Sequence, residues 1–293
     1  MHTYRLFRHP FLLVIVAGVA IEIAWYLLTW RRSYPWREAL ASLGVFVLRI
    51  PAKLVHLLVV VPVAYFVWAH RVATVPLDTW WGLALLFLGE EFTYYWFHRG
   101  SHEIRWLWAS HVTHHTPEQI HLGSAFRLGG TDVLSGGWLY HMPLILLGFN
   151  PLAVGGMLAL NLHYQFWIHT DVIGRLGPLE WVFNTPSHHR VHHASNAEYL
   201  DRNYGGIVII WDRLFGTFAR EEPETPIVYG LVHPIGSLNP LRIMFHEWGA
   251  IAGDTFRANS WRERVNVLFG RPGGSSSGPA AADPSEALAT PAE

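Results

Sequence analysis

Five apolar stretches of 16–18 residues lie between residues 11 and 168, and they constrain the fold more than any other feature of the sequence. As helices they would be about 24–27 Å long, which is at the short end for crossing a hydrocarbon core of about 30 Å. Hydrophobic residues make up 51% of the 293-residue chain and charged residues only 15%, against about 25% charge in a typical soluble domain. We therefore predict an all-α fold, an integral membrane helical bundle with about four to five membrane helices. The stretches are Phe11–Leu28, Leu54–Ala69, Trp80–Phe97, Val133–Phe149 and Leu152–Ile168.

Charge and cysteine content exclude several classes of function. The formal net charge is −1, so the chain has no basic field that would attract a nucleic acid, and no nucleic-acid partner is expected. Cysteine is absent, which excludes disulfides, thiolate zinc sites and cysteine nucleophiles in this chain. Twenty Arg stand against the single Lys53, with abundant Ala and Gly, a composition typical of a GC-rich bacterial gene.

The topology follows from short links and from basic residues. The fourth and fifth stretches are separated only by Asn150 and Pro151, so they are expected to form a helical hairpin. The first stretch continues past Ala20 with Glu22 and Trp25, which fits an uncleaved anchor better than a signal peptide.

Lys and Arg in short loops mark the cytoplasmic side of a membrane protein. The loop between the second and third stretches holds only Arg71, whereas the preceding loop is basic. This predicts a multi-pass protein of the bacterial inner membrane, in which the third helix ends at His98 on the cytoplasmic side. Arg5 and Arg8, which this topology places outside, count against it. The basic residues of the preceding loop are Arg31, Arg32, Arg37, Arg49 and Lys53.

Composition divides the chain into four predicted regions. Residues 1–78 are N-terminal membrane helices, and residues 79–240 are a catalytic domain whose histidine-rich helices cap the cytoplasmic side. Residues 241–270 mix apolar and charged side chains and form an amphipathic C-terminal segment, which either lies on the membrane or covers the cytoplasmic cap. Residues 271–293 are rich in Gly, Ser, Pro and Ala and are expected to be a disordered tail.

Thirteen of the nineteen histidines fall between residues 98 and 193, and they are grouped at helical spacing. The first group is a pair four residues apart, and the next two groups each read H-x-x-H-H. On a helix, positions i, i+3 and i+4 share one face, while two adjacent histidines point about 100° apart. One member of each adjacent pair can therefore serve one metal and its neighbour a second metal. The eight histidines are His98, His102, His111, His114, His115, His189, His192 and His193.

Eight imidazoles are too many for one ion but suit two ions that each keep room for a small molecule. His169, at the end of the fifth stretch, is a ninth candidate. His163 lies about 240° away from it around a helix, whereas Gln165 shares its face, and both are weaker candidates. His188 is a further weak candidate that would support the site without binding metal.

Glu91 precedes His98 and His102 by seven and eleven residues, which places it within about 20° of both on a helix. A carboxyl group in a membrane helix is costly and therefore needs a reason. We expect it to orient a metal-bound imidazole through the second ring nitrogen. Pairing with a basic side chain such as Arg127 is the alternative.

Three functions fit these residues. Two redox-active ions held by imidazole can reduce dioxygen and oxidise an unactivated C–H bond. Imidazole also suits zinc, so a zinc-dependent membrane hydrolase is an alternative, although H-E-x-x-H is absent. A non-enzymatic metal-binding membrane protein is the third possibility.

The order of the histidine motifs resembles the fatty acid hydroxylase and sterol desaturase superfamily of membrane di-iron enzymes. The segments EFTYYWFHRGSH, WLWASHVTHH, NTPSHHRVHH and NYGGIVIIWDRLFGTF are similar to its alkylglycerol monooxygenase-like bacterial branch. The resemblance covers about residues 90–268 and implies metal roles for the eight histidines and for His169. In relatives, a further histidine often occupies the position of Gln165, so one metal is completed by His163, by Gln165 or by water.

The resemblance also implies the chemistry. Two iron ions would use dioxygen and two external electrons to hydroxylate, desaturate or oxidatively cleave a sterol-like, fatty acyl or ether lipid. The chain contains no recognisable electron-transfer domain, so a ferredoxin, a cytochrome or a reduced pterin would deliver the electrons. The expected partners are thus a lipid substrate, the membrane and that electron donor.

Overall fold

The computed structural model describes residues 10–31 and 33–273, and over these residues the fold is all-α, as predicted. The described residues also form two isolated antiparallel β-bridges, one between Phe183 and Val208 and one between Ala194 and Tyr229. Arg5, Arg8 and most of the predicted tail lie outside the described residues. The helices are α1 (Pro10–Leu28), α2 (Trp36–Ala69), α3 (Trp80–Glu103), α4 (Arg105–His115), α5 (Asp132–Ser135), α6 (Met142–Leu147), α7 (Pro151–Ile168), α8 (Pro186–His192), α9 (Ile210–Phe215), α10 (Pro240–Arg257) and α11 (Trp261–Phe269), with 3₁₀ turns η2 (Leu122–Phe126), η3 (Gly137–His141) and η4 (Gly177–Trp181).

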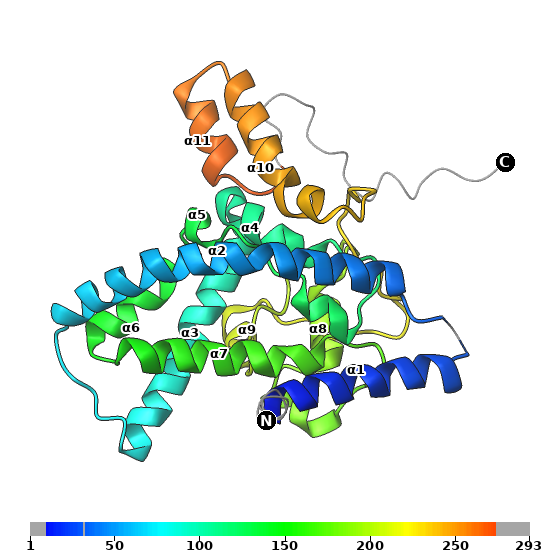
Figure 1. Ribbon diagram of the computed structural model, residues 1–293, viewed down its shortest axis with the longest axis horizontal. Coiled ribbons are helices and arrows are strands. Elements are labelled where there is room, and N and C mark those ends of the chain that lie inside the picture. Colours follow the sequence, from blue (N-terminus) through cyan, green and yellow to red (C-terminus); the bar gives the residue numbers. More distant parts are fainter. Residues whose placement is uncertain (1–9, 32, 274–293) are drawn as a thin grey trace, which may run out of the picture.

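Helix α2 is much longer than the second apolar stretch. Its 34 residues rise about 51 Å, and it runs across most of the molecule (Figure 1). The predicted loop before residue 54 is wrong over most of its length, because Arg37, Arg49 and Lys53 lie within the helix. Among the described residues, α2 is the one helix long and apolar enough to cross a membrane, and only 6% of its most apolar window is buried.

The fourth apolar stretch is not one helix. It divides into α5, η3 and α6 because Gly136 adopts a left-handed conformation, with φ of +77°, which a residue with a side chain would resist. A Cβ atom on Gly137 would lie 2.5 Å from the Phe97 ring, so the chain approaches α3 closely at this break. The prediction of a fourth membrane-spanning helix here is therefore wrong.

The third and fifth stretches form the helices expected of them. Thr79 caps α3 by accepting a hydrogen bond from the Gly82 amide, and Asn150 caps α7 in the same way at Leu152. Helix α3 continues beyond the apolar stretch to Glu103, so its last turns carry polar side chains. It packs against both α7 and α4. These contacts bring the ends of α3 and α7 to the base of the histidine-bearing helices.

Helix α1 begins and ends close to the first apolar stretch, but it packs on η2 rather than along α2, α3 or α7. Its Glu22 is 2% exposed and accepts hydrogen bonds from the Leu122 amide at 2.9 Å and the Thr170 hydroxyl at 2.6 Å. The polar position inside this apolar helix therefore ties α1 to the loops beside the histidines.

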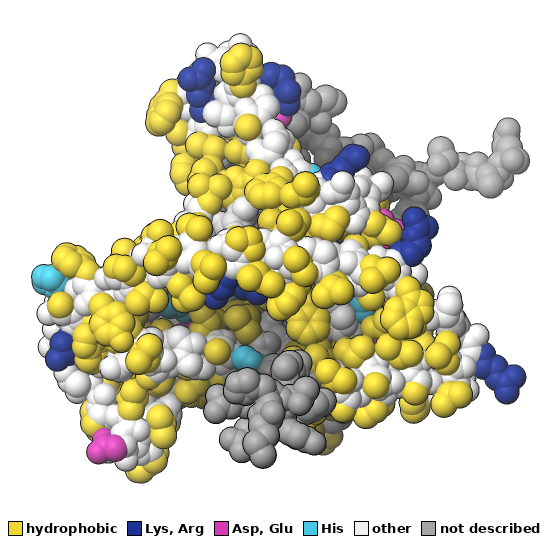
Figure 2. All heavy atoms as spheres, viewed as in Figure 1, with side chains coloured by type: hydrophobic (Ala, Val, Ile, Leu, Met, Phe, Trp, Pro, Cys, Tyr) yellow, Lys and Arg dark blue, Asp and Glu magenta, His cyan; other side chains and the backbone are white. Residues whose placement is uncertain are grey.

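The C-terminal segment folds as two helices that cover the histidine-bearing part of the fold. Ile243 and Met244 of α10 pack against Ala41 and Val45 of α2. The Arg105 side chain at the start of α4 donates to Glu247 of α10 at 2.7 Å. The segment packs on α2 and α4, and both predicted arrangements, on the membrane or over the cap, stay predictions. Figure 2 shows that apolar side chains nevertheless occupy much of the exposed face of the molecule, including α1 and α2.

Candidate metal centre

Nine histidines from four helices converge in two adjacent groups. In each group the candidate ligand nitrogens all lie within 4.8 Å of one another. We name the groups the five-histidine cluster and the four-histidine cluster. The five-histidine cluster is His98, His102, His111, His115 and His192, and the four-histidine cluster is His114, His169, His189 and His193.

The predicted division of adjacent histidines between two groups is confirmed. His114 and His115 are neighbours on α4, yet their imidazoles belong to different clusters. His192 and His193, at the end of α8, divide in the same way. The two clusters are in contact, because the His115 and His193 rings stack with centroids 4.5 Å apart.

Hydrogen bonds fix where the protons of the four-histidine cluster lie. The His169 Nδ1 atom is 2.6 Å from the Gln165 carbonyl, and the His114 Nδ1 atom is 3.3 Å from the Arg127 carbonyl. A carbonyl only accepts, so both Nδ1 atoms carry the proton and both Nε2 atoms carry a lone pair in the neutral rings. These two Nε2 atoms lie 3.1 Å apart. Two acceptors at this distance repel each other unless a cation lies between them.

The five-histidine cluster has the same construction. The His98 Nδ1 atom donates to the Tyr204 carbonyl at 2.8 Å, and its Nε2 atom lies 3.1 Å from that of His111. The His192 Nδ1 atom donates to the Arg202 carbonyl at 2.9 Å. The Nε2 atom of His192 is buried and has no hydrogen-bond partner among the described residues. Main-chain carbonyls thus orient two imidazoles in each cluster, with the Nε2 atom left free to bind an ion.

The spacing of the donor atoms fits bound metal ions. Two nitrogens that bind one ion at about 2.1 Å, at octahedral or tetrahedral angles, are about 3.0–3.4 Å apart. The closest Nε2 pairs of the four-histidine cluster are 2.8–3.1 Å apart. The donor set is all imidazole, which suits iron, zinc, copper and nickel.

Burial keeps these imidazoles in the neutral form that binds metal. For His114, His115, His192 and His193, removal from water and then the neighbouring imidazoles hold the pKa well below 6.5. The rings therefore need no deprotonation near neutral pH before they bind an ion.

Among the described residues, Glu91 makes no hydrogen bond to an imidazole, so the prediction that it orients a metal-bound ring directly is wrong. The alternative prediction, that it pairs with Arg127, is also wrong. Its carboxyl group accepts hydrogen bonds from the Asn161 side chain at 2.6 Å and from the Ile207 and Val208 amides at 2.9 Å. Arg127 pairs instead with Glu38. Glu91 thus anchors the segment that follows Tyr204, whose carbonyl orients His98.

The three weaker candidates lie outside both clusters. The Gln165 side chain bonds to the Tyr94 hydroxyl and to Asn161, so only its main-chain carbonyl acts on the site. His163 is exposed on α7 and its ring bonds to the carbonyl one turn earlier. His188 packs on the Phe218 ring with centroids 5.2 Å apart.

The sequence analysis noted the segment after Arg202 only as part of the family resemblance and gave its residues no role. Asp212 of α9 is fully buried and accepts from the Tyr204 amide at 2.8 Å and the Gly205 amide at 2.7 Å. The Gly205–Gly206 pair allows this close approach, because a Cβ atom on Gly206 would lie 2.0 Å from the Asn161 side chain. The NYGG sequence followed by a buried aspartate was the available signal.

Comparison with known proteins matches residues 83–217 to the fatty acid hydroxylase family. The matched segment contains all nine clustered histidines. Among curated proteins the chain is 41% identical to human alkylglycerol monooxygenase, in an alignment that covers 80% of this chain and 52% of the human enzyme. It is 37% identical to the Xenopus tropicalis alkylglycerol monooxygenase, in an alignment that covers 90% of this chain and 57% of that enzyme. It is also 37% identical to the ornithine lipid hydroxylase of Rhizobium tropici, in an alignment that covers 44% of this chain and 39% of that protein. The chain spans about half the length of the two alkylglycerol monooxygenases, and no solved structure gave a significant match.

Proposed function

We propose that this protein is a membrane-bound di-iron oxygenase that oxidises a C–H bond of a lipid with dioxygen. The observation that carries the proposal is the pair of adjacent imidazole clusters, whose Nε2 lone pairs converge without protons between them. The fatty acid hydroxylase match supports iron over the other metals that imidazole binds. We assign one ion to each cluster, with the nine clustered histidines as ligands, and take residues 79–240 as the catalytic domain.

Iron bound in the two clusters would supply the reduction of dioxygen to an oxidant able to attack an unactivated C–H bond, given two electrons from outside. The chain's own residues hold and orient the ligands. The carbonyls of Gln165, Arg202 and Tyr204 fix the ring tautomers. The clusters are nearly covered by the surrounding helices, and this limits the access of water to the oxidant.

We place the substrate among lipids with a polar headgroup. The similar proteins are named for alkylglycerol and ornithine lipid, and we infer hydroxylation next to the ether oxygen of an alkylglycerol lipid, followed by cleavage, as the first reaction to test. A ferredoxin, a cytochrome or a reduced pterin would deliver the electrons.

We infer that α2 crosses the inner membrane of a bacterium, that α3 and α7 pack beside it within the bilayer, and that the clusters lie on the cytoplasmic side. The apolar surface of α2 supports this, since a core helix of a soluble protein would be mostly buried, whereas the apolar window of α2 is 6% buried. On the other two helices, Leu83, Leu85, Leu152 and Leu160 are exposed. Lipid would cover these side chains.

The experiment is lipid analysis of cells that express the native chain or a His189→Ala variant under ¹⁸O₂. We expect labelled hydroxyl or cleavage products with the native chain and their loss with the variant. His163→Ala is the matched control, because it removes an exposed imidazole from outside both clusters, and we expect its products to equal those of the native chain.

Other outcomes would replace the proposal. Products that have lost two hydrogens without gaining label would identify a desaturase. Tightly bound zinc together with ester or peptide hydrolysis, and no oxygen consumption, would identify a hydrolase and overturn the oxygenase.

A further inference from the structure

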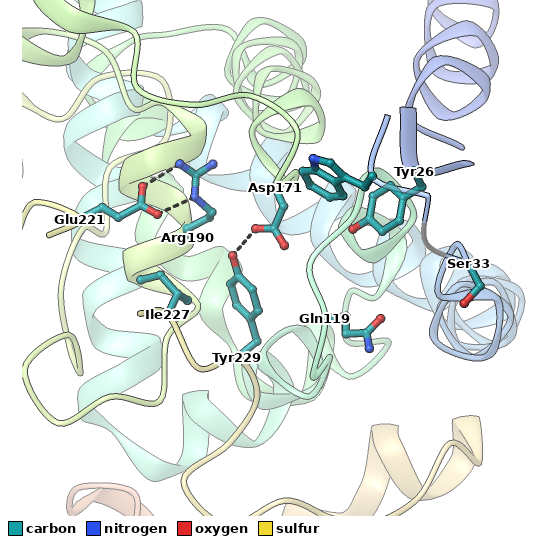
Figure 3. Close-up of a pocket in the computed structure, with 9 residues that line it drawn as sticks. Tyr26, Ser33, Gln119, Asp171, Arg190, Glu221, Ile227 and Tyr229 are labelled. Atoms are coloured by element: carbon teal, nitrogen blue, oxygen red, sulfur yellow. Dashed lines mark hydrogen bonds and ion pairs between the residues drawn. The ribbon is translucent and has the colours of Figure 1, made fainter. Parts of the chain in front are cut away.

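A cavity of about 800 Å³ lies beside the four-histidine cluster and is not part of it. Its lining comes from the end of α1, from α8 and from three loops (Figure 3). Asp171 lies two residues after His169, and Arg190 directly follows His189. Two residues that line the cavity, Asp171 and Arg190, therefore follow candidate metal ligands closely in the chain.

The arginine in this cavity is fully engaged by the protein. Two guanidinium nitrogens of Arg190 donate to the Glu221 carboxylate at 3.0 and 2.6 Å. A third donates to the carbonyls of Thr170 and Ile173 at 3.1 and 2.7 Å. Arg190 and Glu221 thus form a neutral, bidentate pair, and neither contributes net charge to a ligand.

Asp171 supplies the unbalanced charge. One of its carboxylate oxygens accepts a hydrogen bond from the Tyr229 hydroxyl, and the group has no ion pair among the described residues. Figure 3 shows the carboxylate pointing into the cavity between Tyr229 on one side and Tyr26 on the other. With Asp171 ionised, the charges of Arg190, Glu221 and Asp171 in the lining of the cavity sum to −1.

Aromatic rings flank this carboxylate. Tyr26 and Trp30 pack edge to face with centroids 4.8 Å apart, and both line the cavity together with Tyr229. Ring faces attract cations, most of all alkylated ammonium groups, which have no strong hydration shell to lose. An anionic carboxylate among three aromatic rings is suited to an organic cation and unsuited to a phosphate or carboxylate.

We propose that this cavity binds the ammonium group of a lipid headgroup. The preference for an ammonium group follows from the cavity alone. That the ammonium group belongs to a lipid rests on the proposed function. A headgroup held here lies next to the four-histidine cluster, so the carbon that is oxidised would lie near the polar end of the lipid rather than deep in its chain.

The test is calorimetric titration of the iron-loaded protein in a non-ionic detergent with dihexanoylphosphatidylcholine. Dihexanoylphosphatidylglycerol, which lacks the ammonium group, and free choline are titrated in parallel. We expect the choline lipid to bind at least about tenfold more tightly than the glycerol lipid. Equal affinity for the two lipids would overturn the proposal, and choline binding as tightly as the lipid would overturn the lipid source.

Two variants test the assignment of residues. Asp171→Asn keeps the shape and removes the charge, and we expect binding to weaken about 10- to 100-fold. Trp30→Leu removes a ring without touching the loop of His169, and we expect a loss of about threefold or more. Glu224→Gln, an exposed acidic residue in the loop of Glu221, is the matched control and should bind like the native chain.

The iron content of each variant is measured alongside. If Asp171→Asn and Trp30→Leu both bind dihexanoylphosphatidylcholine with the affinity of the native chain, at native iron content, the proposed site is refuted. Binding requires no turnover, so ammonium-dependent binding without lipid oxidation would remove the proposed function and leave the cavity assignment in place.

Discussion

Replacing Glu91 by glutamine should destabilise the protein and loosen His98. The carboxyl group is 1% exposed and accepts three hydrogen bonds, two from the main-chain amides of Ile207 and Val208 and one from Asn161. An amide keeps one accepting oxygen but presents an NH₂ group to the Asn161 donor. The oxygen can still accept from both amides, so one of the three buried hydrogen bonds, that from Asn161, is replaced by a donor–donor contact at a cost of about 1–3 kcal/mol.

The expected loss of about 1–3 kcal/mol corresponds to a fall in Tm of about 2–5 °C for a chain of this size. Thermal unfolding followed by circular dichroism in detergent measures it, and iron content reports whether the segment after Tyr204 still orients His98. Glu103→Gln on the same helix is the matched control, because its partly exposed ion pair with Arg99 contributes only about 0–1 kcal/mol. A Tm for the Glu91 variant equal to that of the control would refute the reasoning.

Further predictions concern the clusters and their supports. His114→Ala and His115→Ala should each reduce bound iron from two ions toward one per chain, measured by mass spectrometry, because the two rings belong to different clusters; loss of both ions in each variant would contradict separate sites. In the metal-free protein, the histidines of α4 and α8 outside the membrane have pKa values held well below 6.5 in the folded state. The unfolded chain then binds more protons than the folded chain as the pH falls below about 6.5, and stability should decrease by about 1.4 kcal/mol per histidine per pH unit; a denaturation midpoint that is constant between pH 7 and 5 would disagree. Arg127→Met should cost about 3–5 kcal/mol, because it leaves the Glu38 carboxylate without its buried partner, and chemical denaturation that detects less than about 1 kcal/mol would show that the pair is not needed.

The division of adjacent histidines between two groups could be predicted from the sequence because it depends on short-range helical geometry. An i, i+3, i+4 pattern fixes which imidazoles share a face, and an adjacent pair such as His114 and His115 must diverge. The position of His169 at the end of an apolar helix made it a candidate, and its metal role was implied by the family resemblance. These relations need no knowledge of how distant segments pack.

Long-range partners could not be predicted in this way. Glu91 lies on the same side of α3 as His98, yet its hydrogen bonds go to residues 116 and 117 positions later in the chain. The fourth apolar stretch was misassigned because hydropathy does not register the left-handed turn at Gly136. The charges of Arg37 and Arg49 favour a loop in a hydropathy profile, yet both residues lie within α2, because arginine is a good helix former.

The central claim is that the two clusters each hold a redox-active ion, and metal analysis of the purified protein tests it most directly. Inductively coupled plasma mass spectrometry of protein from iron-supplemented cells should find close to two iron ions per chain, with Mössbauer spectra of a coupled pair. Zinc at full occupancy, or iron bound equally well after His114 and His192 are both replaced by alanine, would contradict the account.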